Sequence, residues 1–287
     1  MDVNSPEIVA LRRQVHAADE EFHYALQFHE AWRPTATDTA LHERVGRSHA
    51  TNTFNVIRAA LRREMLLALM RVWDTNPNAV RMFSISNALA DKRIVAALAA
   101  ACVAERRNAK IAAFDHEDAE AMGRIEIQFG EHQAQILQRR AADAVAIIRK
   151  YDKTGSGRQT FEYLRKLRNE RLAHREVKEN AEVAAGPDTT DDDIERFFQD
   201  TLQVVRLLKV VVEQTSYDPE QTASIFGRNA MFFWAGVKGE RTEGHPYYRG
   251  FTWLSGEGFV PVILLQRRLE RRVFDPGDFS VMREGKH

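Results

Sequence analysis

The run from Ile194 to Val212 carries apolar residues on more than one helical face. Thr190 precedes it as a helix-capping residue, and aspartates fill positions 191–193, where the dipole of a starting helix favours negative charge. A helix that is apolar on several sides must be covered by other elements on those sides. We therefore expect this helix at the centre of a helical bundle, with its excess apolar face at a subunit interface.

Amphipathic stretches along the chain predict the helices that cover it, and the fold class is all-α. The first helix should begin at Ser5-Pro6 and end near Trp32, before Pro34. Residues 34–47 are expected as a loop or short helix. Further helices are expected at about residues 50–73, 86–107 and 116–150, the last with Asp115 as its cap. Another helix should begin at a capping Ser156 and include residues 161–178. The long helix at 116–150 should span the bundle or brace a dimer.

Composition limits the location and the partners of the chain. Its 287 residues contain 41 basic and 41 acidic side chains, so no global field draws nucleic acid to it, and an RNA surface must be a local patch. The single cysteine, Cys102, excludes an internal disulfide, is expected as a buried small side chain and fits a reducing cytoplasm. The N-terminus lacks a signal-peptide pattern, and the Ala-rich run around Cys102 is too short to cross a membrane. A cytoplasmic protein is expected.

The last part of the chain has a different composition. We expect a helical bundle over residues 1–215 and a C-terminal extension of unknown role over 216–287. In the extension, Asp218-Pro219 opens a short helix to about residue 235. Apolar runs at 251–254 and 259–265 flank a Gly-Glu-Gly turn and predict a hairpin, with Pro261 in an edge strand. Arginines at 267, 268, 271 and 272 predict either a packed cap with a basic rim, which we favour, or a surface that stacks bases.

The segment from Phe161 to Lys178 gathers six basic side chains with Asn169 and His174. A guanidinium binds phosphate oxygens and stays charged, whereas an imidazole exchanges protons at neutral pH. RNA supplies its own 2′-hydroxyl nucleophile, so these groups suit cleavage without metal. Arg168 and His174 are six residues apart, about 120° out of line on a straight helix. A long side chain, an irregular helix or a second copy of the chain must bring them together.

Spacing alone also permits a plainer interpretation, in which this segment is a solvated basic helix face with a half-buried histidine. Arg44 and His49 show a similar spacing, although Gly46 interrupts them and no apolar stripe accompanies them. His16, Glu20 and His23 share a face of the first helix, and we favour a polar edge over a metal site there. Phosphate loops, paired cysteines and metalloprotease motifs are absent from the sequence, so neither metal nor cofactor is expected.

The segment LRKLRNERLAHRE resembles the motif of the HEPN superfamily, an arginine and a polar residue followed by a histidine. Together with FNVIRAALRREMLLALMRVWDT, it is similar to the abortive-infection AbiU-type branch, over about residues 15–215. The resemblance implies a dimeric all-helical bundle whose two motifs face each other and cut RNA without metal. It assigns the active site to Arg168, Asn169 and His174 and supporting chemistry to Asp74. Glu176 replaces a tyrosine that some HEPN toxins present for nucleotide attachment.

The leading hypothesis is a homodimeric ribonuclease in phage defence (abortive infection) or a toxin. His174 would act as general base or acid, Arg168 would stabilise the phosphorane and Asn169 would position the groups. Arg165, Arg171 and Arg175 would hold the RNA backbone. An antitoxin or another defence-system protein is an expected partner. The alternative is a non-catalytic helical scaffold that binds RNA or a partner through the same basic patch, and a third candidate is an effector whose C-terminal extension senses a ligand.

Overall fold

A computed structural model describes residues 2–45, 48, 50–74, 76, 79–111, 119–169 and 190–239. Within these ranges every regular secondary-structure element is a helix. The sole β-type pairing there is an isolated bridge between Trp73 and Arg81. The predicted all-α fold is confirmed. None of the described helices combines the length and the apolar composition needed to cross a lipid bilayer.

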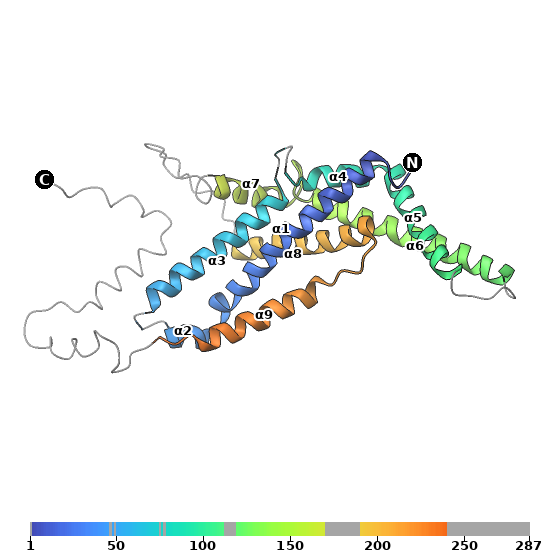
Figure 1. Cartoon of the computed structure of the whole chain (residues 1–287). Helices are drawn as coiled ribbons and strands as arrows, with labels where there is room; N and C mark the ends of the chain where they lie inside the picture. Colours follow the sequence, from blue (N-terminus) through green and yellow to red (C-terminus); the bar gives the residue numbers. More distant parts are fainter. Residues whose placement is uncertain are drawn as a thin grey trace, which may run out of the picture.

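Two long helices, α1 (Pro6–Thr37) and α3 (Thr51–Val72), lie side by side along much of their length (Figure 1). The short helix α2 (Thr39–Val45) lies between them in the sequence, within the stretch expected as a loop or short helix. Helix α9 (Pro219–Gly236) packs on another side of α1, where the indole Nε1 of Trp234 donates to the carbonyl of Ala31 at 2.9 Å. The predicted boundary at residue 215 stays a prediction, and the expected hairpin and arginine cluster lie outside the described residues.

Helix α8 (Asp191–Leu208) packs against α1, α6 and α7, as expected for the bundle centre. Its capping is confirmed: the Thr190 hydroxyl accepts the N–H of Asp193, and the Asp193 carboxylate accepts the N–H of Thr190. The side chains buried on its successive faces include Phe197, Phe198, Val204, Val205 and Leu208. A wider π-helical segment, η3 (Lys209–Glu213), continues it. The expected role of α8 in a subunit interface stays a prediction.

The helix expected over residues 86–107 is two helices, α4 (Met82–Ala90) and α5 (Lys92–Ile111). They separate at Asp91, whose extended backbone ends α4 and whose carboxylate accepts the N–H of Arg93 at 2.8 Å. This local hydrogen bond competes with helix continuation, which explains the break. Helix α6 (Ala119–Arg149) pairs with α5, and the two project together from the bundle (Figure 1).

Two predicted helix ends were wrong. Helix α1 runs through Pro34 to Thr37. Pro34 costs the helix one backbone hydrogen bond, and the hydroxyls of Thr35 and Thr37 donate to the carbonyls of Trp32 and Arg33 in the preceding turn. Helix α7 (Arg158–Leu167) begins after Gly157 and has no side-chain cap, so Ser156 does not form the expected capping box. Glycine is required at 157, since an added Cβ would lie 2.4 Å from the Tyr151 ring.

Candidate active site

Asp74 and Arg168 are 94 residues apart in the sequence and form an ion pair in the structure. Asp74 follows α3 directly, and Arg168 lies at the end of α7. The Arg168 Nη1 donates to the Asp74 Oδ2 at 3.0 Å, and both side chains are about one-fifth exposed. Partial burial strengthens a charge-assisted hydrogen bond of this kind. The pair therefore joins the end of α3 to the basic segment that the sequence singles out.

Asn169 completes a three-residue cluster with this pair. Its Oδ1 accepts the Nε–H of Arg168 at 3.0 Å. The helix widens to a π-helical turn at Arg168 and Asn169. An irregular helix was one of three ways considered for bringing Arg168 and His174 together, and His174 lies outside the described residues. A guanidinium has five N–H groups, and two of them are engaged here, so three have no partner among the described residues. Asp74 and Asn169 thus orient the guanidinium and leave donors for another anion.

The position of Arg168 follows from the packing of α7. Phe161 and Leu164 are both 1% exposed, and Arg168, four residues after Leu164, lies one turn further along the same face. The apolar part of this face packs toward α8 and α3. Continuation of the face beyond the core brings the guanidinium to the end of α3, where Asp74 lies.

The position of Asp74 is set by its neighbour Trp73, which is buried at the centre of an aromatic cluster. The indole lies 5.2 to 6.1 Å, between ring centroids, from four rings, those of Phe83, Tyr151, Phe161 and Phe197. Its Nε1 donates to the Thr201 hydroxyl at 3.0 Å, and this hydroxyl donates to the Phe197 carbonyl. Because Phe161 belongs to α7, the same cluster holds both helices that contribute to the Asp74–Arg168 pair.

The other predicted site residues are placed only in part. His174, Arg171 and Arg175 lie outside the described residues, and their roles stay predictions. Arg165 is 41% exposed and pairs with Glu162 at 2.9 Å, one turn before Arg168. In the first helix, His16 and Glu20 are exposed and 3.5 Å apart, and no group of three metal-ligating side chains occurs in the described part of the chain.

A buried charged cluster around His29 was missed in the sequence. His29 lies between two carboxylates, with Nδ1 3.0 Å from Glu30 and Nε2 3.0 Å from Glu195, and its ring stacks on Phe198 at 4.0 Å. Arg33 lies 2.8 Å from the second Glu30 oxygen. Burial lowers the pKa of His29, but hydrogen bonds and attraction from Glu195 and Glu30 outweigh it, so the pKa lies above 6.5. The adjacent residues His29 and Glu30 could be seen in the sequence. Glu195 could not be connected to them, because it lies 166 residues away from His29.

Raising the pH should destabilise the fold through His29. A folded-state pKa above the unfolded value gives stability that is complete below the unfolded pKa and is lost as pH rises through the folded one. We expect the free energy of unfolding, measured by urea denaturation, to fall as the pH rises above about 6.5. His29→Gln should lower it by about 2 kcal/mol at pH 6 and flatten this slope. The exposed His16→Gln is the control, and an unchanged slope in His29→Gln would refute the assignment.

The same His29 contact lowers the pKa of Glu195, because the hydrogen bond from His29 stabilises the carboxylate more than partial burial disfavours it. A lowered carboxyl pKa contributes stability that is present above its unfolded value and is lost as pH falls through the folded one. The cluster therefore stabilises the contact between α1 and α8 most in mildly acidic solution, between the two titrations.

Comparison with known proteins identifies the family of the chain. The sequence model of the family described as AbiU2, within the HEPN group, matches residues 8–233. The chain belongs to the AbiU2 family of HEPN proteins. The matched region contains Asp74, Arg168, Asn169 and most of α9. No curated protein and no solved structure matched the chain.

Proposed function

We propose that this protein is a metal-independent endoribonuclease that acts in phage defence, by abortive infection, or as a toxin. The observation that carries the proposal is the Asp74–Arg168–Asn169 cluster, in which a guanidinium is oriented by two hydrogen bonds and three of its N–H groups have no partner among the described residues. Membership of the AbiU2 HEPN family supports the assignment of class. A homodimer, and an antitoxin or another defence-system protein as partner, belong to the same proposal.

The proposed reaction uses the 2′-hydroxyl of the RNA as nucleophile. His174 removes the hydroxyl proton, and the oxygen attacks the adjacent phosphorus to form a pentavalent phosphorane. The Arg168 N–H groups that Asp74 and Asn169 do not engage stabilise the negative charge on the phosphorane oxygens. The bond to the 5′-oxygen then breaks, and that oxygen takes a proton from the protonated imidazole or from water. The products carry a 2′,3′-cyclic phosphate and a 5′-hydroxyl.

The remaining residues have positioning or binding roles in this proposal. Asp74 and Asn169 restrain the Arg168 side chain, and restraint of a catalytic group lowers the entropy lost when the transition state forms. Arg165, Arg171 and Arg175 hold the phosphates on either side of the cleaved bond. His174 removes the 2′-hydroxyl proton next to the phosphate that Arg168 binds. This Arg168 belongs either to the same chain as His174 or to a second copy.

Incubation of the purified full chain with total RNA in EDTA tests the proposal. We expect fragments that end in a 2′,3′-cyclic phosphate, identified by mass spectrometry, and we expect none with His174→Ala. Intact RNA that nevertheless comigrates with the protein would favour the alternative of a non-cleaving RNA-binding scaffold. Fragments of equal yield from His174→Ala would indicate a contaminating nuclease and would oppose the assignment.

A further inference from the structure

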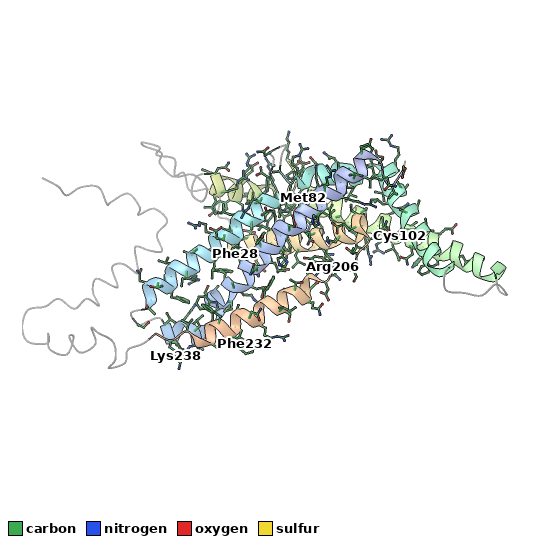
Figure 2. All side chains as sticks on the ribbon, in the orientation of Figure 1. Phe28, Met82, Cys102, Arg206, Phe232 and Lys238 are labelled. Atoms are coloured by element: carbon green, nitrogen blue, oxygen red, sulfur yellow. The ribbon has the colours of Figure 1, made fainter. Side chains whose placement is uncertain are left out.

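A cavity of about 490 Å³ lies where α5 and α6 leave the bundle, on the side of α8 and η3. It shares no lining residue with the Asp74–Arg168 cluster. Figure 2 labels two of its lining residues, Cys102 on α5 and Arg206 on α8. Its volume is in the range of pockets that hold small ligands. The cavity is therefore a candidate binding site separate from the proposed site of cleavage.

The lining of this cavity divides into two chemical parts. An apolar part comes from Ile136, Leu137, Leu207 and Val210. The polar part contains three amides, Gln133, Gln203 and Gln214, and two arginines, Arg140 and Arg206, but no carboxylate. Arg206 is held by Glu220 at 2.9 Å, whereas Arg140 is exposed and has no ion pair among the described residues. Because Glu220 offsets the charge of Arg206, the attraction for an anion comes mainly from Arg140, with an apolar surface beside it.

The backbone next to the cavity is unusual. The π-helical segment η3 ends at Gln214, which has a φ of 57° and is the one non-glycine residue with positive φ among the described residues. The Gln214 side chain donates to the Leu98 carbonyl at 2.9 Å and so ties the end of η3 to α5. Single π-helical turns and left-handed non-glycine residues occur frequently at functional sites. Both lie at this cavity.

We propose that the cavity binds a nucleoside phosphate. Arg140 and Arg206 contact the phosphate, because a guanidinium donates paired hydrogen bonds to phosphate oxygens. The base lies against the apolar wall formed by α6 and the end of α8. The glutamine side chains have both donors and acceptors for the edges of the base. The proposal does not depend on RNA cleavage by the protein.

Cys102 reports occupancy of the cavity directly, because it is the one cysteine in the sequence and lines the cavity. The rate of its alkylation by N-ethylmaleimide can be followed by intact mass. We expect ADP or GDP to slow alkylation about tenfold when present at about ten times its Kd. Arg140→Gln should remove this protection. Arg139→Gln is the matched control, since Arg139 is exposed on the same helix and does not line the cavity.

Inorganic phosphate and adenosine separate the two parts of the ligand. Equal protection by inorganic phosphate would overturn the nucleoside assignment, and equal protection by adenosine would overturn the role of the arginines. Calorimetric titration of ADP and GDP into the full chain measures binding independently of thiol reactivity. Absence of binding by calorimetry, or equal loss in Arg139→Gln and Arg140→Gln, would refute the proposal whether or not the protein cleaves RNA.

Discussion

Arg168→Ala is expected to lower the rate of RNA cleavage by about a hundredfold to a thousandfold, the effect of removing one preorganised donor to a developing anion. The fold should survive, because the side chain lies at the edge of the core and is partly exposed. Arg168→Lys should recover only part of the rate, since an ammonium keeps the charge but cannot donate to Asp74, Asn169 and a phosphate in the same planar arrangement. Single-turnover cleavage of a mapped RNA measures these rates.

Lys166→Ala is the matched control for Arg168→Ala. Lys166 is an exposed basic residue on the same helix, two positions away, so its removal changes the net charge equally. We expect the Lys166 variant to cleave within about threefold of the wild-type rate, because an exposed charge contributes mainly to association. Equal rate losses in the two variants would assign the effect to general charge. An unchanged rate in Arg168→Ala, with circular dichroism showing the wild-type fold, would exclude Arg168 from the chemistry.

Trp73→Ala is expected to lower the free energy of unfolding by about 4 kcal/mol, the range for removal of a large buried aromatic side chain. The indole is 1% exposed and contacts rings from α4, α7 and α8 as well as Tyr151. Its loss should also weaken cleavage, because Trp73 precedes Asp74 and holds the end of α3 against α7. Urea denaturation gives the stability, and the same RNA assay gives the rate.

A double-mutant cycle separates the packing of Trp73 from its hydrogen bond to Thr201. Thr201→Val leaves the buried indole N–H without an acceptor and should cost about 1 to 3 kcal/mol. Trp73→Phe removes the donor and part of the ring. The double variant should lose less stability than the sum of the two single variants, because it contains neither the indole N–H nor the Thr201 hydroxyl that a single variant leaves without its partner. Strict additivity would show that the hydrogen bond does not contribute to stability.

Features that depend on neighbouring residues were predictable from the sequence. The cap at Thr190, the Asp218 cap of α9 and the apolar stripe of α3 each follow from spacings of a few residues. Asp74 was named from the resemblance to the HEPN superfamily, and the structure brings it to Arg168. Family resemblance, rather than spacing, supplied that assignment, because no local pattern connects residues 94 positions apart.

Features that depend on tertiary contacts were not predictable. Two features of local origin were missed as well, the break at Asp91 and the continuation of α1 through Pro34, because in each a side-chain hydrogen bond over two to four residues competes with an equally local helix signal. The His29–Glu195 contact joins the first and eighth helices. The cavity beside η3 is lined by residues of α5, α6, α8 and η3, a combination that periodicity in a single segment cannot indicate.

In the proposed reaction Arg168 acts on an RNA phosphate whose own 2′-hydroxyl is the nucleophile. Two oligonucleotides test it most directly: an RNA that contains the mapped cleavage position, and the same RNA with a single 2′-deoxynucleotide on the 5′ side of that bond. We predict that the full chain in EDTA cuts the first and leaves the second intact at that position. Cleavage of both at the same rate would contradict the account.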